Sequence, residues 1–149
     1  MTTSLITAPN IALAAAFALA LPLHSMAQDA ARASVAAVDT FYEAIRTADA
    51  DMLSGVLAED AVIRLADLGF DMTAEEFVAS MDEWEAVAKD MTMRVRPDPA
   101  TPDTDETIVR LVCYEFPSNA SMTRETSTVV DGAITANMQE EVAENCEGF

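Results

Sequence analysis

Histidine is scarce in this 149-residue chain, which has only one, His24, near the N-terminus. If the segment that contains it is removed, the remaining chain has no imidazole. Ser–His and Cys–His nucleophilic catalysis are then excluded, and so is the commonest zinc ligand. The sequence also has no CxxC motif and no dense aspartate loop of the calcium type. We therefore expect no metal and no cofactor.

Basic residues are also few, since 8 stand against 26 acidic residues and the formal net charge is −18. A surface so acidic is repelled by nucleic-acid phosphates and by anionic lipids. We therefore expect no nucleic-acid partner and no membrane partner. The acidic residues are scattered rather than clustered, which favours a role in solubility over a specific site.

Only one long apolar run is present, IALAAAFALALPL at residues 11–23. It is too short to span a bilayer as a helix, which takes roughly 20 residues. HSMA–Q follows, with Ser25 and Ala27 where signal peptidase prefers small residues. This pattern predicts a signal peptide at 1–27 and a single domain at 28–149, in the periplasm or secreted, although no Lys or Arg precedes the run. The alternative is a buried apolar helix.

The chain has only two cysteines, Cys113 and Cys146. In an exported protein an even pair favours a disulfide, which here would close a loop of 33 residues (146 minus 113). The alternative is a pair of buried free thiols. The disulfide prediction therefore depends on the prediction of export.

Helices are predicted in the first half of the expected domain. Apolar residues recur at three- and four-residue steps over 29–47, and Asp49 can cap a short second helix. After a strand at 61–65 and a loop at 67–71, the capping-box pattern of Thr73–Ala–Glu–Glu76 opens a third helix that ends near Asp90.

Antiparallel sheet is predicted in the second half. Strands are expected at 91–96, 107–116, 121–130 and 133–143, and 107–116 is apolar on both faces, as in a central strand. Asp131–Gly132 is a strong hairpin turn between the last two strands. The register set by that turn places residue 125 opposite residue 138 and directs one set of side chains inward: Glu125, Ser127, Val129, Ile134, Ala136 and Met138.

With this order of elements, FYEAIRTADADMLSGVLAEDAVIRL (41–65) resembles the opening of the nuclear transport factor 2-like superfamily, which includes SnoaL-like cyclases and ketosteroid isomerase. The closing VVDGAITANMQEEV resembles that group's last hairpin. The resemblance implies an α+β fold in which a cone-shaped, curved mixed β-sheet wraps around three N-terminal helices and an apolar pocket. Many members are homodimers that pair through their sheets, so the resemblance also implies a homodimer.

The resemblance does not extend to the isomerase catalytic pair. Aligned on that family, Phe41 occupies the position of the helix-one tyrosine and Leu65 that of the strand aspartate. Phenylalanine has no hydroxyl and leucine cannot take a proton. Tyr42 is one residue away, which rotates it by about 100° around the helix. The histidine that SnoaL-like members often use is missing as well.

Glu125 is the strongest candidate for a catalytic residue, because a buried carboxyl has a raised pKa and can act as a general base. Its alternatives are a sheet-edge position or an ion pair with Arg110. Tyr42 is the second candidate, as a hydrogen-bonding partner of a ligand, and the alternative is an ordinary core residue. We expect the ligand pocket to contain Phe41, Tyr42, Trp84, Tyr114, Glu125 and Met138.

The sequence therefore predicts an exported protein that binds a small apolar molecule or a protein partner, without catalytic activity. The alternative is a cofactor-independent isomerase, dehydratase or cyclase with Glu125 as general base. The interior distinguishes these functions. Converging polar groups in a sizeable cavity favour an enzyme, and an apolar cavity favours binding. A filled interior beside an exposed apolar sheet favours a protein partner.

Overall fold

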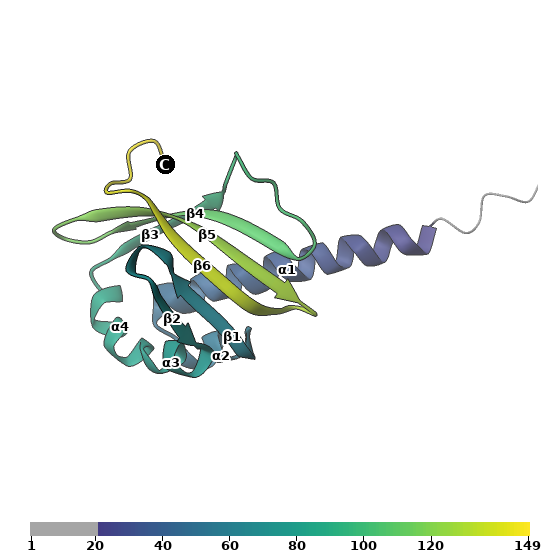
Figure 1. Cartoon of the computed structure of the whole chain (residues 1–149), viewed down its shortest axis with the longest axis horizontal. Coiled ribbons are helices and arrows are strands. Elements are labelled where there is room, and N and C mark those ends of the chain that lie inside the picture. Colours follow the sequence, from purple (N-terminus) through teal and green to yellow (C-terminus); the bar gives the residue numbers. More distant parts are fainter. Residues whose placement is uncertain (1–20) are drawn as a thin grey trace, which may run out of the picture.

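The computed structural model describes residues 21–149 of the chain, with side chains from residue 27 onward. Figure 1 shows a helical N-terminal part followed by a curved sheet. The elements in chain order are α1 (Leu21–Thr47), α2 (Ala50–Ser54), β1 (Leu57–Leu65), the 3₁₀ helix η1 (Ala66–Leu68), β2 (Phe70–Thr73), α3 (Ala74–Ala79), α4 (Met81–Ala88), β3 (Thr92–Pro97), β4 (Thr107–Glu115), β5 (Ala120–Val130) and β6 (Ala133–Ala143).

The strands form one mixed sheet in the order β2-β1-β6-β5-β4-β3. All neighbouring pairs are antiparallel except β1 and β6, which are parallel. The concave face of this sheet packs on α1, and α2, α3 and α4 lie on the same side (Figure 1). The predicted α+β cone fold is confirmed.

Local capping signals explain where the short helices begin. The Asp49 carboxylate accepts a hydrogen bond from the Met52 backbone N–H at 2.8 Å, as expected of an N-cap. Thr73 and Glu76 form the predicted capping box at the start of α3. The helix expected to run on to Asp90 is instead interrupted at Ser80, whose hydroxyl donates to the Phe77 carbonyl at 2.7 Å. The break turns α4 away from α3.

The loop predicted at 67–71 is more regular than expected. It contains part of η1 and the start of β2, which pairs with β1 so that Leu65 lies opposite Phe70. Gly69 permits this tight reversal, because its φ of 60° lies in the left-handed region that favours glycine. The predicted strand at 61–65 is correspondingly longer and begins at Leu57.

A register shift in the last hairpin changes which residues of β6 point inward. Val129 lies opposite Ile134, as predicted, but Thr128 lies opposite Ala136, so β6 carries one extra residue at this point. Beyond the bulge, Glu125 faces Gln139 rather than Met138. The predicted inward orientation of Ala136 and Met138 is therefore wrong, and Met138 is 41% exposed.

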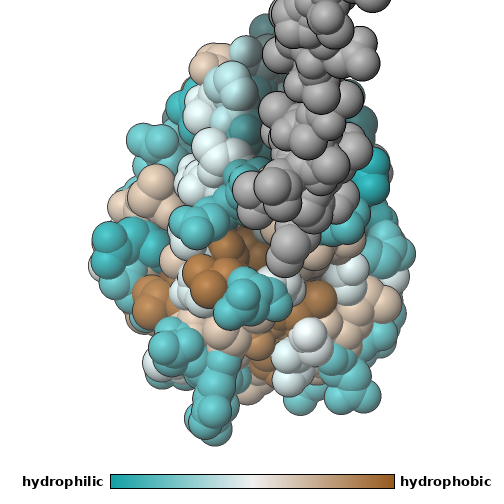
Figure 2. Space-filling view, turned by 90° about the vertical axis from the view of Figure 1, so that its right-hand side faces the viewer, coloured by the Kyte–Doolittle hydropathy of each residue, from teal (hydrophilic) through white to brown (hydrophobic). Residues whose placement is uncertain are grey.

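The core lies between α1 and the concave face of the sheet. Large side chains from every layer are fully buried there: Phe41, Leu53, Ile63, Ile108, Val112 and Ile134. Hydrophilic residues dominate the end of the molecule that Figure 2 shows, and a smaller group of apolar residues gathers near its centre.

The helix α1 runs from Leu21 across the predicted cleavage point after Ala27. Most of the predicted signal peptide, residues 1–20, lies outside the described residues. Within residues 21–149, none of the helices combines the length and apolar character needed to cross a membrane.

Candidate functional site

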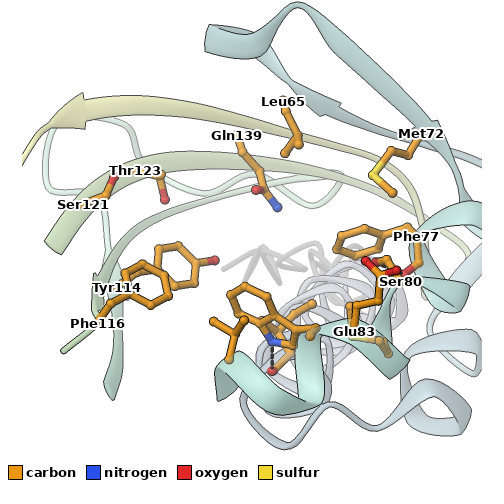
Figure 3. Close-up of a pocket in the computed structure, with 14 residues that line it drawn as sticks. Leu65, Met72, Phe77, Ser80, Glu83, Tyr114, Phe116, Ser121, Thr123 and Gln139 are labelled. Carbon is orange, nitrogen blue, oxygen red and sulfur yellow. Dashed lines mark hydrogen bonds between the residues drawn. The ribbon is translucent and has the colours of Figure 1, made fainter. Parts of the chain in front are cut away.

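A cavity of about 520 Å³ opens between the concave face of the sheet and the helices (Figure 3). Every layer of the fold contributes side chains to it. β1 and β2 supply Leu65 and Met72, α1 supplies Ile45, and the β4–β5 hairpin supplies Tyr114, Phe116, Ser121 and Thr123; the remaining lining residues are Phe77, Ser80, Met81, Glu83, Trp84, Val87 and Gln139. This volume falls in the range of small-molecule binding sites.

Aromatic residues form one side of the cavity. Trp84 donates its indole N–H to the Ile45 carbonyl at 2.7 Å, which fixes α4 against α1. Phe116 lies edge-to-face with Trp84, with ring centroids 6.5 Å apart, and parallel to Tyr114, with centroids 6.4 Å apart. The indole hydrogen bond satisfies the one polar atom of Trp84, so the ring is free to offer apolar contact to a ligand.

A buried carboxyl lies directly behind the polar wall of the cavity. Tyr114 and Thr123 both line the cavity, and their hydroxyls donate to Oε1 of Glu125 at 2.8 and 2.9 Å. The Glu125 side chain is fully buried. Burial raises the pKa of Glu125 above its ordinary value, and the hydroxyls around it offset only part of this effect.

The second oxygen of this carboxyl, Oε2 of Glu125, is buried and has no hydrogen-bond partner among the described residues. The same is true of the nearby Tyr42 hydroxyl. Burial raises the pKa of the Tyr42 hydroxyl well above its ordinary value, and the nearby Glu125 carboxyl adds to this effect. The Tyr42 hydroxyl and the Glu125 carboxyl nevertheless do not form a hydrogen bond. A carboxyl whose pKa is raised is a group of the kind that enzymes use for proton transfer, provided that a substrate comes within hydrogen-bond reach of it.

The bulge in β6 brings a row of amide and hydroxyl groups to the concave face. Gln139, which lines the cavity, donates from Nε2 to Oδ1 of Asn137 at 3.1 Å. Asn137 in turn donates to the Ser127 hydroxyl at 3.0 Å. The sequence pattern assigned Asn137 and Gln139 to the solvent face, because a strict alternation from the turn cannot reveal an extra residue.

Arg110 does not form an ion pair with Glu125, although β4 and β5 place the two residues opposite each other. Its guanidinium is buried and contacts both carboxylate oxygens of Asp103 at 2.9 Å. Asp103 also accepts from the Val109 backbone N–H at 3.0 Å, which holds the loop before β4 in place. Glu125 is thus left without a cationic partner, contrary to one of the sequence-based alternatives.

The structure separates the predicted pocket residues into four groups. Trp84 and Tyr114 line the cavity, whereas Glu125 and Tyr42 lie behind its wall. Phe41 is a core residue that stacks on Phe77 with ring centroids 6.0 Å apart. Met138 faces away from the cavity, because the bulge in β6 turns Gln139 inward in its place.

Several lining residues were not predicted from the sequence, and some of them had a signal. The alternation of Ala61, Ile63 and Leu65 in β1 places Leu65 on the concave face. Leu65 also aligns with the strand aspartate of the isomerases, so its position in the cavity could have been inferred. Phe116 and Gln139 had no such signal, because their orientation depends on how the strands pair.

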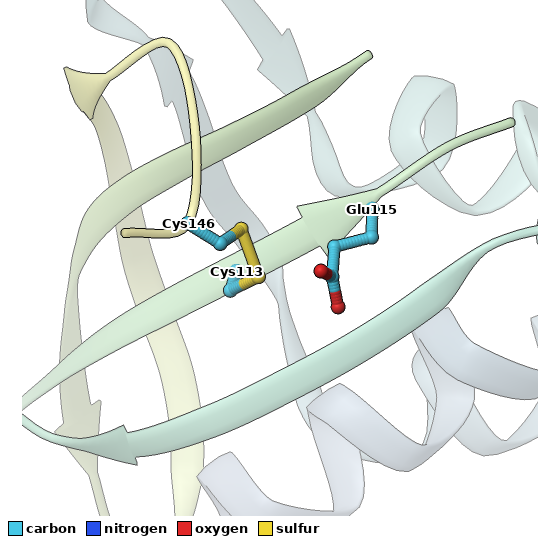
Figure 4. Close-up of side chains that lie close together, drawn as sticks. All are labelled: Cys113, Glu115 and Cys146. Carbon is cyan, nitrogen blue, oxygen red and sulfur yellow. A yellow bond between two sulfur atoms is a disulfide. The ribbon is translucent and has the colours of Figure 1, made fainter. Parts of the chain in front are cut away.

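Cys113 and Cys146 form a disulfide that ties the C-terminal tail to β4 (Figure 4). Glu115 lies beside the bridge, and its carboxylate pairs with Arg94 at 3.3 Å. The three side chains are close enough for metal coordination, but both sulfurs are bonded to each other. This cluster therefore offers no metal site in the disulfide-bonded protein.

The sequence matches no protein-family model and no curated protein. The structure, in contrast, is similar to solved structures. An NTF2-like protein of unknown function from Burkholderia xenovorans superposes with a TM-score of 0.64 at 14% identity, covering 83% of this chain and 90% of its own. A candidate ketosteroid isomerase from Kribbella flavida gives a TM-score of 0.61 at 15% identity, and the superposition covers 79% of this chain and 85% of the isomerase. IdmH, a candidate polyketide cyclase from Streptomyces antibioticus, gives a TM-score of 0.60 at 21% identity, and the superposition covers 73% of this chain and 91% of IdmH.

Proposed function

We propose that this chain, which has the fold of the nuclear transport factor 2-like superfamily, is an exported protein that binds a small, largely apolar molecule in the cavity between its sheet and helices. The observation that carries the proposal is the cavity itself: about 520 Å³, with mostly apolar walls, a polar end formed by Tyr114, Thr123 and Gln139, and Glu83 on the opposite side (Figure 3). Such a site fits an apolar body with a single polar group directed at that end.

The position of Glu125 favours binding over catalysis. Its carboxyl contributes no atom to the cavity wall, because Tyr114 and Thr123 stand between it and the hollow. A general base must come within hydrogen-bond reach of the proton that it takes. In this arrangement Glu125 instead orients the two hydroxyls that face a ligand.

Nile red, a neutral apolar dye, tests the proposal because its emission rises on entering an apolar site. We expect saturable binding of one dye per chain to the wild-type protein. Leu65→Trp fills the cavity from β1 and should weaken binding at least tenfold. The matched control is Val62→Trp on the convex face of the same strand, where Val62 is exposed, and it should bind as the wild type does.

Circular dichroism and the unfolding temperature of both tryptophan variants establish that they fold. Emission of Trp84, the only tryptophan of the wild-type chain, gives a second readout from within the cavity. Lack of saturable binding, or equal weakening by Leu65→Trp and Val62→Trp, would show that the cavity is not the binding site.

A second candidate function is cofactor-independent proton transfer, of the isomerase, dehydratase or cyclase type. The observation in its favour is the pair of unpartnered buried atoms, Oε2 of Glu125 and the Tyr42 hydroxyl. Small movement of Tyr114 or Thr123 would give a substrate access to this carboxyl. The probe is 5-nitrobenzisoxazole, which opens when a base removes its one acidic carbon-bound proton.

If Glu125 is a base, ring opening should accelerate as pH rises through the pKa of its carboxyl and should fall at least a hundredfold in Glu125→Gln. Glu85→Gln is the control, because Glu85 is exposed and pairs with Lys89 at the surface. A rate equal in Glu125→Gln and the wild type would exclude this second function.

The proposal includes a second copy of the chain as protein partner. Val62 on β1 and Met138 on β6 lie exposed on the convex face of the sheet, on neighbouring strands. Pairing through this face would cover both residues and leave the cavity, which opens on the concave side, accessible.

A further inference from the structure

We infer that the cavity selects its ligand by charge, taking cationic amines with an apolar body in preference to neutral analogues, and excluding carboxylates and phosphates. This inference rests on the proposed binding function. It concerns the chemical class of the ligand, which the apolar lining alone does not define.

The cavity wall contains no basic side chain. The only ionisable groups among its lining residues are Glu83 on α4, whose side chain is also exposed to solvent, and the neutral hydroxyl of Tyr114. An anionic ligand would therefore lose its water without gaining a cation. Burying an unpaired charge in this way is strongly unfavourable, so a carboxylate or phosphate head group is excluded.

No basic residue elsewhere in the described chain is poised to supply the missing charge. Seven of the eight basic residues have a carboxylate within 4.0 Å: Arg32, Arg46, Arg64, Lys89, Arg94, Arg110 and Arg124. The eighth, Arg96, donates to the Gly148 carbonyl and lies over the Phe149 ring at 5.0 Å. None of these eight residues lines the cavity, so an anion bound there has no cationic partner.

Carboxyl groups, in contrast, lie on two sides of the cavity. Glu83 lies on the wall, and Glu125 lies behind Tyr114 and Thr123 with one oxygen unpartnered. A nearby cation favours the ionised form of a carboxyl, so an ammonium group in the cavity would draw Glu125 towards its charged state. The net charge of −18 adds a field that concentrates cations at the opening.

The aromatic side of the cavity also suits a cation. Trp84, Tyr114 and Phe116 form a continuous cluster there. Aromatic rings carry negative charge on their faces, and tryptophan attracts ammonium groups most strongly. The same rings supply contact area for an apolar body, which explains why one surface can hold both parts of an amphiphilic amine.

Three probes with a common 4-phenylbutyl body test the inference by displacing Nile red: 4-phenylbutyltrimethylammonium, 4-phenylbutanol and 4-phenylbutanoate. We expect affinities in that order, with at least a tenfold difference between the ammonium and the carboxylate. Repeating the titration in 0.5 M NaCl screens the distant surface charges. The order should persist there, because Glu83 and the aromatic rings that produce it line the cavity.

Two variants with the same change in net charge separate the cavity from the surface. Glu83→Gln removes the carboxylate on the wall and should lower the affinity for the ammonium probe about fivefold, with little effect on the alcohol. Asp82→Asn removes an exposed charge on the same helix, outside the lining, and should change it less than twofold.

Each result has a distinct meaning. If Nile red binds and the three probes displace it equally well, the charge selectivity is wrong and the binding function stands. A carboxylate that binds most tightly, or equal effects of Glu83→Gln and Asp82→Asn, would also overturn the selectivity. If Nile red does not bind at all, the binding function fails and the inference falls with it.

Discussion

At the scale of single residues, Glu125 is the group whose surroundings differ most from those of an ordinary carboxylate. It is fully buried, accepts two hydrogen bonds on one oxygen and none on the other, and has no cationic partner among the described residues. Desolvation therefore outweighs the hydrogen bonds and raises its pKa. The titratable and charged groups that face it are few: Tyr42 from α1, and Tyr114 and Arg110 from β4, of which Arg110 is neutralised by Asp103.

Replacing Glu125 with glutamine should stabilise the protein at neutral pH. Because its pKa is raised on folding, the folded state holds the proton more tightly, so wild-type stability is highest below the pKa of the unfolded chain. It falls as pH rises towards the folded pKa. Glu125→Gln should remove this decline and raise the free energy of unfolding at pH 7 by about 1–3 kcal/mol, the cost of a poorly satisfied buried group.

Urea unfolding of both proteins between pH 4 and pH 8 measures the difference. It should be smallest at pH 4 and increase with pH. A constant difference over this range would mean that the proton on Glu125 is not linked to folding. Asp105→Asn, in the exposed loop before β4, is the control for loss of one negative charge and should show no such trend.

At the scale of secondary-structure elements, β4 connects the cavity to the C-terminal tail. Tyr114 points to the cavity, and its neighbour Cys113 is bonded on the opposite face to Cys146 in the tail. Arg96 and Arg94 from β3 hold the end of this tail, because their guanidinium groups lie over the Phe149 ring at 5.0 and 4.9 Å. The bridge and the two arginines thus anchor a segment that has little core of its own.

Removing the disulfide should destabilise the protein by about 3–4 kcal/mol, because the bridge limits the freedom of a 33-residue loop in the unfolded chain. The double variant Cys113→Ala/Cys146→Ala, compared with the wild type in guanidinium unfolding, measures this loss. Thiol titration of unfolded, unreduced protein from an oxidising compartment should find no free thiol. Two thiols per chain would contradict the bridge.

The capping box at the start of α3 is a smaller test at the same scale. The Thr73 hydroxyl accepts a hydrogen bond from the Glu76 backbone N–H. Thr73→Ala removes this acceptor, because alanine has no hydroxyl. We expect a loss of about 1 kcal/mol in the free energy of unfolding. Thr104→Ala, in the loop before β4, is a useful comparison, since it removes a hydroxyl that accepts from Thr107 outside any helix. Equal losses would indicate that the cap adds nothing specific to the helix.

At the scale of the whole molecule, net charge and exposed apolar surface have opposite effects on self-association. The exposed apolar residues Val62 and Met138 on the convex face favour contact between two copies. A net charge of −18 on each copy opposes it. Ionic strength changes the second effect much more than the first.

We therefore expect the proposed homodimer to strengthen with salt. Sedimentation velocity should show more dimer in 0.5 M NaCl than in 0.02 M NaCl, where charges interact over about 20 Å or more. Met138→Asp should weaken the dimer at both concentrations. Leu68→Asp adds the same charge at an exposed site on η1 and should have a smaller effect. A monomer under all conditions would exclude this partner.

Local interactions explain how much of this molecule could be predicted. Asp49 and Thr73 cap helices through groups within three residues of themselves, and Asp131–Gly132 forms its turn in the same way. Such signals depend little on the rest of the fold. The helices and strands predicted around them are present, apart from the break at Ser80, the earlier start of β1 and the strand β2 in the predicted loop. The stretch 41–65, whose resemblance to the nuclear transport factor 2-like superfamily implied a cone fold, is likewise a local pattern, and the fold is confirmed.

The cavity and its polar end depended on contacts between distant segments, and the sequence alone did not determine them. One extra residue in β6 exchanges Met138 for Gln139 on the concave face, since consecutive strand residues point to opposite sides. Asp103 pairs with Arg110 because a loop folds back on β4, which leaves Glu125 without a cation. The sequence determined which residues were available and which local elements they form; strand pairing and loop packing decided which of them face the cavity.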